Sequence, residues 1–346
     1  MSIRRLISNH LYQTGGWVNP VPLFDCDSTF IFGYGARGIG KTYGILGESR
    51  QRALDGRGKF ILLRRQQTQA DFVSKQEFCP FKPLDMDNGY FTEVKRLDKF
   101  TSAFYVDDEI IGYVMALSTV TNIRGFDASD VTTLFYDEFI PEKHARPIKN
   151  ESDALWNCYE TMNRNRELFG QPPLKLIAMS NANDISNEIF LSLGVVDKID
   201  RMKRKGQSIY LNKAKSLAIV DYQNAEISDK KKQTALYKLT QGSDFQKMAI
   251  ENEFLNEFSS EYRSVPLVEC SPFVVVGEIC IYTHKSSDFY YVSLHKTGSP
   301  EEFGAGNTER QRFRNSYFFL WQSYLVRRVV FESRLAEILF RKYFDT

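Results

Sequence analysis

The 346-residue sequence predicts an α/β protein whose larger domain is built around a mainly parallel β-sheet. Three observations lead to this prediction. Short apolar runs alternate with helical patterns over residues 1–196. A glycine-rich loop lies between the first of these runs and a helical pattern. Residues 261–346 instead pair short aromatic-rich strands with two helices, which indicates a second, smaller α+β domain.

The composition indicates a folded protein and gives no sign of a metal or disulfide framework. Hydrophobic residues make up 42% of the chain and charged residues 25%, as in ordinary globular proteins. The five cysteines form no C-x-x-C pair and the four histidines have no metal-ligand spacing, so we expect reduced cytosolic thiols and no zinc site. No run of about 18 apolar residues occurs, so no membrane partner is expected.

The first predicted strand, at Phe30–Phe32, leads into a glycine-rich loop. The loop fits G-x-x-x-x-G-K-[ST], and a helix opening at Lys41 completes the context that this motif needs. Lys41 is expected to reach the β- and γ-phosphates of a nucleotide, and Thr42 to hold Mg²⁺. The backbone N–H groups of the loop and the helix N-terminus are expected to bind the phosphates. The phosphate-binding residues are therefore Gly35, Ala36, Arg37, Gly38, Ile39, Gly40, Lys41 and Thr42.

The later elements of the first domain alternate as a parallel sheet requires. Apolar runs predict strands at 59–63, 103–106, 110–115, 132–136 and 174–179. Helical spacing of apolar residues predicts a helix over 151–167, ended by Gly170 and two prolines. Asp184 is expected to cap a short helix that runs through Leu193.

Asp137 and Glu138 follow the strand 132–136, and Asp137 lies 96 positions after Lys41. With the loop, they predict a hydrolysis site in which Asp137 binds Mg²⁺, directly or through water, and Glu138 polarises the attacking water. Adjacent strand residues point to opposite faces, but both can reach a nucleotide where the strand ends and the backbone turns. Another acidic group, Asp107-Asp108-Glu109, is interpreted as a solvated hairpin turn.

Residues 197–260 are more polar and are interpreted as a linker with a small lid-like element. Ten Lys/Arg against five Asp/Glu lie between Asp197 and Lys232, and eight against four lie between Glu309 and Thr346. Positive charge gathered in limited segments favours contact with a polyanion. Two solvated basic faces would have the same composition, so charge alone leaves both interpretations open.

The chain combines six motifs: the loop with Tyr43, Leu63-Arg64-Arg65, Asp137-Glu138-Phe139, Asn163-Arg164-Asn165-Arg166-Glu167, Ser180-Asn181-Ala182 and the segment from Phe331 to Lys342. Together they resemble the motifs of the φ29-like phage DNA-packaging ATPases. The resemblance runs from about residue 30 to the C-terminus and is strongest in the first 190 residues. It implies a RecA-like additional-strand (ASCE) P-loop ATPase domain over 1–196 and a linker or lid domain over 197–260. It also implies a vestigial RNase H-like nuclease domain over 261–346 that binds nucleic acid or the portal.

What the resemblance implies for function is a viral genome packaging motor. Subunits would form a homomeric ring, expected to be a pentamer, docked on the procapsid portal in the host-cell cytoplasm. The ring would hydrolyse ATP with Mg²⁺ and drive double-stranded DNA into the procapsid. Some relatives use a packaging RNA, and the sequence leaves open whether this protein does.

Two arginines match residues that act across subunits in that family. Arg164 matches an arginine finger, which offsets charge on the γ-phosphoryl group in the transition state. The residues alone favour a different role for Arg164, a surface salt bridge with Glu160 or Glu167. Arg124 matches a position where the family has a lysine, and the change to arginine keeps the charge but alters the geometry.

The remaining candidate site residues end strands near the loop. Arg37, within the loop, is expected to touch phosphates or Glu138. Arg64 and Arg65 are expected to sense the nucleotide. Asn181 ends the strand 174–179, where the ATPase sheet usually places a polar sensor of the γ-phosphate, although a simple strand-end cap is the alternative.

The C-terminal strands lack the aspartates that an RNase H-like nuclease would need to hold two metal ions. Asp288 lies in a turn and Glu269 lies outside the strands, so we expect no nuclease activity. Two alternatives to a packaging motor remain. One is a full terminase with an active nuclease, and the other is a nucleotide-gated nucleic-acid-binding module with little turnover.

Overall fold

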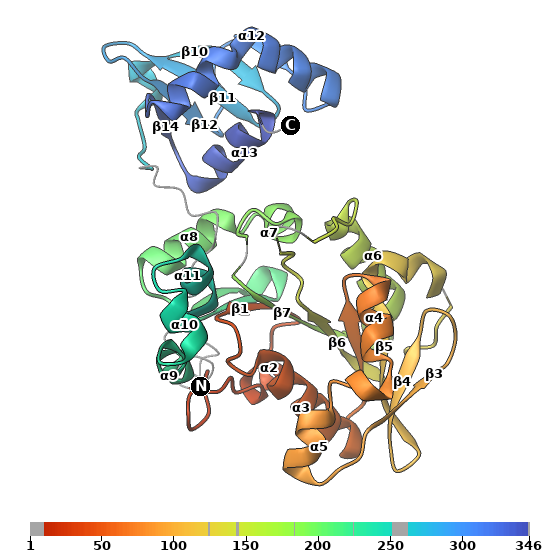
Figure 1. Cartoon of the computed structure of the whole chain (residues 1–346). Helices are drawn as coiled ribbons and strands as arrows, with labels where there is room; N and C mark the ends of the chain where they lie inside the picture. The colour runs from red at the N-terminus through yellow and green to blue at the C-terminus, as the bar shows by residue number, and fades with distance from the viewer. Residues whose placement is uncertain are drawn as a thin grey trace. The chain divides into compact units, whose positions relative to one another are not determined.

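The structure, a computed structural model, describes residues 10–123, 125–142, 145–182, 184–223, 225–250 and 262–344. The chain divides into two compact units (Figure 1). The larger unit contains Met1–Leu193 and Met202–Asn256, and the smaller contains Gly194–Arg201 and Glu257–Thr346. In the described part of the chain, every helix is too short or too polar to cross a membrane.

The larger unit is built on a nine-stranded sheet with the order β3-β4-β5-β2-β6-β7-β1-β9-β8. The six strands from β5 to β9 in this order run parallel, and antiparallel pairs occur only at the edges. The predicted mainly parallel sheet is therefore confirmed. The strands are β1 (Phe30–Gly35), β2 (Lys59–Arg64), β3 (Glu93–Arg96), β4 (Ser102–Val106), β5 (Glu109–Ala116), β6 (Val131–Asp137), β7 (Lys175–Asn181), β8 (Ile209–Asn212) and β9 (Leu217–Tyr222).

Helices cover both faces of this sheet, with α2, α3 and α5 on one face and α6 and α7 on the other (Figure 1). The helices of the chain up to residue 250 are α2 (Val21–Asp25), α3 (Lys41–Leu54), α4 (Gln67–Val73), α5 (Lys82–Asn88), α6 (Glu151–Asn163), α7 (Glu188–Leu193), α8 (Val196–Arg204), α9 (Glu226–Lys232), α10 (Ala235–Leu239) and α11 (Asp244–Ile250). Short 3₁₀ segments lie at Gln76–Phe78, Leu117–Ile123, Arg166–Phe169 and Lys213–Lys215.

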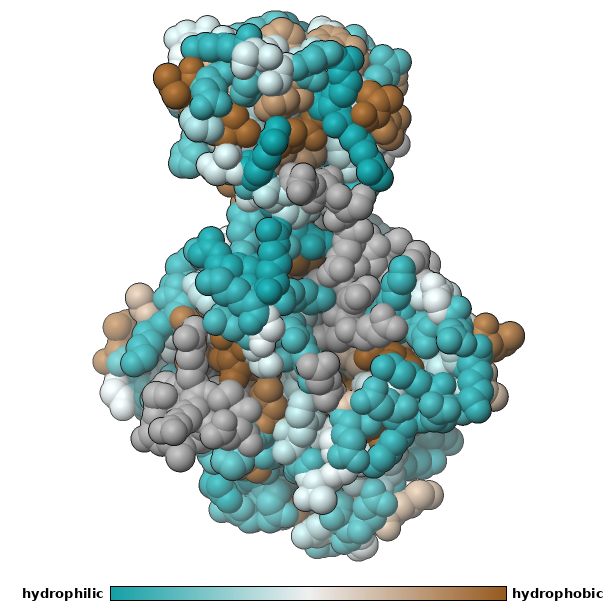
Figure 2. Space-filling view, turned by 90° about the vertical axis from the view of Figure 1, so that its left-hand side faces the viewer, coloured by the Kyte–Doolittle hydropathy of each residue, from teal (hydrophilic) through white to brown (hydrophobic). Residues whose placement is uncertain are grey.

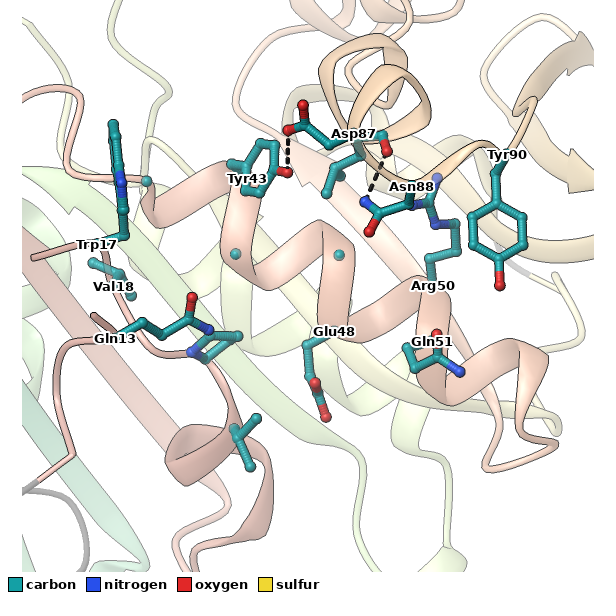
Figure 3. Close-up of a pocket in the computed structure, with 16 residues that line it drawn as sticks. Gln13, Trp17, Val18, Tyr43, Glu48, Arg50, Gln51, Asp87, Asn88 and Tyr90 are labelled. Atoms are coloured by element: carbon teal, nitrogen blue, oxygen red, sulfur yellow. Dashed lines mark hydrogen bonds between the residues drawn. The ribbon is translucent and has the colours of Figure 1, made fainter. Parts of the chain in front are cut away.

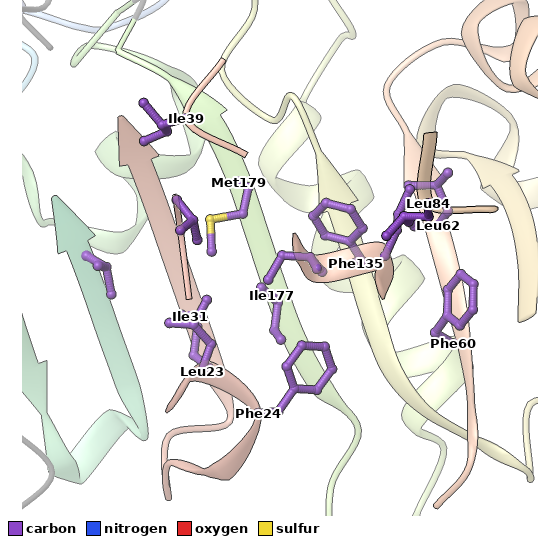
Figure 4. Close-up of a cluster of buried hydrophobic side chains, with 14 of the residues drawn as sticks. Leu23, Phe24, Ile31, Ile39, Phe60, Leu62, Leu84, Phe135, Ile177 and Met179 are labelled. Atoms are coloured by element: carbon purple, nitrogen blue, oxygen red, sulfur yellow. The ribbon is translucent and has the colours of Figure 1, made fainter. Parts of the chain in front are cut away.

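The central strands are continuous apolar runs because both of their faces are buried. On the α3 face, Ile31, Phe135 and Ile177 from neighbouring strands pack side by side in one cluster (Figure 4). On the other face, Phe32 of β1 packs edge-on against Trp156 of α6 and Phe190 of α7. This two-sided core holds the carboxyl ends of β1, β6 and β7 together at one edge of the sheet.

Two strands of the region predicted as a separate linker, 197–260, belong to the large sheet instead. Strand β9 pairs in parallel with β1, from Phe30 beside Leu217 to Gly35 beside Tyr222, and every residue of β9 is buried. Strand β8 then pairs antiparallel with β9. The physical reason is the apolar run within β9, which needs a sheet neighbour to satisfy its buried backbone groups. The structure thus divides the chain differently from the prediction.

The predicted helix 151–167 also ends earlier, at Asn163. The backbone of Arg164 leaves the helical region, with φ 49° and ψ −141°, and Arg166 lies in a separate 3₁₀ turn. Arg164 and Arg166 therefore do not share one helix.

The smaller unit has a five-stranded sheet with the order β13-β10-β11-β12-β14. The strands β10 (Cys270–Val276), β11 (Ile279–His284) and β12 (Tyr290–Ser293) form an antiparallel meander, and β13 (Glu301–Phe303) and β14 (Val329–Phe331) add in parallel at the edges. A 3₁₀ turn at Leu267–Glu269 precedes the sheet, and α12 (Asn307–Leu325) and α13 (Arg334–Phe344) pack on it through an aromatic core. The small α+β unit is as expected, whereas its relation to RNase H stays a prediction.

Candidate functional site

The glycine-rich loop joins the end of β1 to the start of α3, as the motif requires. Gly38 has φ +64° and Gly40 has φ +86°, a left-handed backbone that side chains disfavour. Gly40 also lies against the indole ring of Trp17, which a Cβ atom would approach within 3.1 Å. The two glycines thus permit the sharp curl of the loop, and α3 begins directly after it at Lys41.

Lys41 lies buried beneath this loop, with only 8% of its surface exposed. Its Nζ atom donates hydrogen bonds to the carbonyl oxygens of Gly35 (3.1 Å) and Ala36 (2.6 Å) and to Oδ1 of Asn181 (3.0 Å). Burial lowers the pKa of the Lys41 ammonium to about 7, and the nearby Lys231 and Arg37 lower it too, while Asp137 opposes the shift. An anion bound in this site would therefore stabilise the protonated form of Lys41.

Thr42 and Asp137 meet across the site, where α3 faces the end of β6. The Thr42 hydroxyl donates to both carboxylate oxygens of Asp137, at 3.1 and 3.2 Å. Burial raises the pKa of the Asp137 carboxyl, and Arg64 opposes that shift. A hydroxyl and a carboxylate at this distance are hard oxygen donors of the kind that Mg²⁺ prefers, so the residues fit the ion that the sequence implies.

Glu138 turns out of the strand toward solvent. Its backbone has φ 58°, unusual for a residue with a side chain, and its N–H donates to the carbonyl oxygen of Met179 at 2.7 Å. Its carboxylate is half exposed and accepts a bond from Arg64 at 2.8 Å. Arg64 donates its other terminal nitrogen to Asp137 at 2.5 Å, so one guanidinium holds both acids.

These groups line a cavity of about 450 Å³. The end of β7 contributes Ser180, whose hydroxyl bonds the backbone of Ile140, and Asn181, which bonds Lys41. The structure thereby brings together most of the predicted site residues. The cavity is lined by Arg37, Gly38, Gly40, Lys41, Thr42, Tyr43, Asp137, Glu138, Ser180 and Asn181.

Two predicted residues have other partners. Arg65 points away from the cavity and forms a buried two-pronged ion pair with Glu151, at 2.7 and 2.6 Å, which also accepts a bond from the Tyr136 hydroxyl. Arg37 pairs with Glu142 and not with Glu138. Adjacent strand residues face opposite sides of the sheet, which explains why Arg64 reaches the acids and Arg65 does not.

The two candidate residues for action across subunits lie outside this cavity. Arg164 donates to the carbonyl oxygen of Phe126 at 2.7 Å, just before β6 begins, so it lies toward the amino edge of the strand whose carboxyl end carries Asp137. Neither the expected salt bridge with Glu160 nor that with Glu167 forms in the described chain. Arg124 lies outside the described residues.

A second cavity, of about 650 Å³, adjoins the first and shares Gly40 and Tyr43 with it (Figure 3). Trp17 and Gln13 lie on one side of it, and Arg50 and Tyr90 lie on the other (Figure 3). The sequence analysis missed this cavity because its walls come from separate segments that carry no motif. In the described residues, no group of three or more His, Cys, Asp or Glu side chains is placed to hold a metal ion.

The sequence is also similar to known proteins. The profile of the family described as "Podovirus DNA encapsidation protein (Gp16)" matches residues 13–266, well over half of the chain. The chain is 28% identical over 241 residues to the DNA packaging protein of Bacillus phage B103 and 27% identical over 240 residues to that of Bacillus phage phi29. These alignments cover 67% and 69% of this chain but only 66% of each relative's length.

The fold is similar to that of a chain in the structure titled "The bacteriophage Phi-29 viral genome packaging motor assembly". The TM-score is 0.69 at 20% sequence identity, and the similarity covers 95% of this chain and 99% of that one. A chain of "The Phi-28 gp11 DNA packaging Motor" is also similar, with a TM-score of 0.61, 20% identity and coverage of 96% and 97%.

Proposed function

The chain belongs to the family of podovirus DNA encapsidation proteins, and we propose that it is an ATP-hydrolysing motor that moves double-stranded viral DNA into a preformed procapsid. One observation carries the proposal. One cavity at the carboxyl edge of a parallel sheet is lined by Lys41, Thr42, Asp137, Glu138 and Asn181. Ligands of open α/β sheets bind at this edge.

Each of these residues has a role that its position supports. The loop amides and Lys41 bind the β- and γ-phosphates of ATP, and Asn181 orients Lys41 and senses the γ-phosphate. Thr42 and Asp137 would hold Mg²⁺, which supplies positive charge to the phosphoryl oxygens when bound. Glu138 accepts a proton from the attacking water, since its half-exposed carboxylate lines the cavity and its bond to Arg64 orients it.

The second cavity is the proposed place for the nucleoside. It shares Gly40 and Tyr43 with the phosphate cavity, so a ligand can extend from one to the other. Trp17 and Tyr43 supply aromatic surface that suits a base, and polar side chains such as Gln13 lie beside them.

Arg164 is proposed to complete the site of a neighbouring copy. Its bond to Phe126 lies toward the amino edge of β6, and the cavity of its own chain lies at the carboxyl edge. An arginine supplied by a neighbour would offset charge on the γ-phosphoryl group and contribute about 10³- to 10⁵-fold in rate. Arg124 is proposed to act across the same boundary.

The partners are proposed from the family and from charge. Subunits form a ring, with five copies as the expected number, on the procapsid portal in the host-cell cytoplasm. DNA phosphates contact the basic segments, so binding is expected to be insensitive to sequence. The smaller unit is proposed to bind nucleic acid or the portal without cleaving DNA, and a packaging RNA is a further candidate partner.

Steady-state phosphate release by the purified protein tests the proposal. Wild-type protein is expected to hydrolyse ATP, and Lys41→Ala and Glu138→Gln are expected to abolish turnover. Asp107→Asn, in the exposed hairpin turn, serves as the matched acidic control and is expected to leave turnover unchanged. Tight ATP binding without turnover in the wild type would favour a binding module instead, and metal-dependent cutting of supercoiled DNA would favour a full terminase.

A further inference from the structure

The segment that contains α9, α10 and α11 holds the phosphate-binding loop at Arg37. The Arg37 N–H donates to the carbonyl oxygen of Ala249 in α11, at 2.8 Å. The Arg37 carbonyl oxygen accepts a hydrogen bond from Nζ of Lys231 in α9, at 2.5 Å. Both backbone polar groups of one loop residue are therefore bound by this segment, which is far from the loop in sequence.

Lys231 differs from the two lysines beside it. Lys230 pairs with Glu226 and Lys232 with Asp229 on the exposed side of the helix. This side of the larger unit is largely hydrophilic (Figure 2). The amine of Lys231 turns inward instead and is partly buried.

The amine of Lys231 lies within the curl of the loop itself. A Cβ atom on Gly38 would come within 2.5 Å of it, so the absence of a side chain at Gly38 makes room for the lysine. Gly38 is one of the residues that line the phosphate cavity. Lys231 thus reaches the edge of that cavity from a helix outside the loop.

Three basic side chains consequently converge on the loop: Lys41, Arg37 and Lys231. Lys231 and Arg37 both oppose protonation of Lys41, so the three charges act on one another. Asp137 and Glu138 favour the charged form of Lys41, and Glu142 pairs with Arg37, so these acids offset part of the charge. The dense negative charge of a di- or triphosphate would stabilise all three cations at once.

We propose that Lys231 is a second phosphate-binding lysine of this site, which binds the nucleotide's phosphates and thereby fastens α9–α11 to the loaded loop. The inference rests on the proposed function, since it requires that the loop binds a nucleotide. As a consequence, a bound nucleotide would contact the segment 226–250 directly through the side chain of Lys231. The backbone bond between Arg37 and Ala249 would link the loop to the same segment.

The substitution Lys231→Gln removes the positive charge of Lys231 but can keep its hydrogen bond to the Arg37 carbonyl oxygen. Glutamine keeps a donor for the Arg37 carbonyl but has no charge for the phosphates. With a fluorescent ADP or ATP analogue and the full chain, we expect binding to weaken about tenfold or more, since a charge-assisted bond is lost. Lys230→Gln removes the same charge from the exposed side of α9 and is expected to bind like the wild type.

A second measurement is hydrogen exchange in α9–α11. Nucleotide is expected to slow exchange there in the wild type and in Lys230→Gln, and to have a much smaller effect in Lys231→Gln. If Lys231→Gln lowers the melting temperature of the nucleotide-free protein, Lys231→Arg serves as a further test, because arginine keeps the positive charge. Nucleotide affinity restored in Lys231→Arg would support the phosphate-binding role of Lys231. Affinity that is not restored would overturn that role.

The outcomes separate this inference from the proposed function. Wild-type affinity in Lys231→Gln, together with lost affinity in Lys41→Ala, overturns the role of Lys231 and leaves the nucleotide site standing. If the wild-type protein binds neither analogue, the proposed function fails, and the role of Lys231 fails with it.

Discussion

At the scale of single residues, Lys41 is the group whose protonation changes in the physiological pH range. Burial lowers its pKa to about 7, so at pH 8 the free protein holds this side chain mainly as the neutral amine. Bound phosphates stabilise the ammonium and raise the pKa. Between the two pKa values the complex holds more protons than the free protein, so nucleotide affinity must fall as pH rises.

We therefore expect binding at pH 8 to take up close to one proton per site, and affinity to fall between pH 7 and pH 9. Titration calorimetry in two buffers of different ionisation enthalpy measures the uptake. The phosphates themselves are already ionised at pH 8, since their last pKa is about 6. Equal heats in both buffers would show that Lys41 is protonated before the nucleotide binds.

Arg64 and Arg65 are neighbours in sequence with different predicted phenotypes. Arg64→Ala frees both acids of the site, so we expect turnover to fall about tenfold or more. Asp137 keeps Thr42 and Lys41 as partners, so we expect a smaller loss of stability than in Arg65→Ala. Arg65→Ala leaves Glu151 buried without its ion partner, so we expect about 3–5 kcal/mol lower unfolding free energy. Phosphate release and urea unfolding of both variants check this, and a stable, inactive Arg65→Ala protein would contradict it.

Single residues also show how much of the site can be predicted from the sequence. Lys41, Asp137 and Asn181 could be placed together because carboxyl ends of parallel strands meet at one edge. The choice between Arg64 and Arg65 could not be made, because it depends on which face of the sheet each side chain points to at the end of β2. Trp17 and Lys231 carry no motif and reach the loop only through tertiary packing.

At the scale of elements, β9 is the main departure from the sequence-based prediction. Its apolar run is only a few residues long and lies among lysines and asparagines, so the average polarity of the region hides it. In the structure, β1 pairs with β7 along one side and with β9 along the other. The strand that leads into the phosphate-binding loop is thus supported on both sides, and α9–α11 follow directly from that support.

A substitution in β9 is therefore expected to weaken the whole large sheet. Ile219 is fully buried, and Ile219→Ala should lower the unfolding free energy by about 2–5 kcal/mol. Leu239→Ala, in α10, is the control, since Leu239 is 84% exposed and its truncation should change little. Urea unfolding of the full chain measures both. An independent linker would instead leave the main transition of Ile219→Ala where it is in the wild type.

At the scale of the whole molecule, the proposed site is one that a single chain does not complete. Loop residues and both acids line one cavity, and Arg64 bonds the two acids, whereas Arg164 bonds Phe126, toward the amino edge of the sheet. A ring of copies resolves this separation, because each chain can offer its arginine to the cavity of the next. The same arrangement would link the firing of one site to the position of its neighbour.

Mixing two inactive variants tests this central claim most directly. Lys41→Ala lacks a working loop but keeps Arg164, and Arg164→Ala has an intact loop but no arginine to offer. Each variant alone is expected to show almost no ATP turnover in the assembled ring. If Arg164 acts on a neighbour, mixed rings should recover part of the wild-type rate of phosphate release. Full turnover by Arg164→Ala alone, or no recovery in rings shown to contain both variants, would contradict a site shared between subunits.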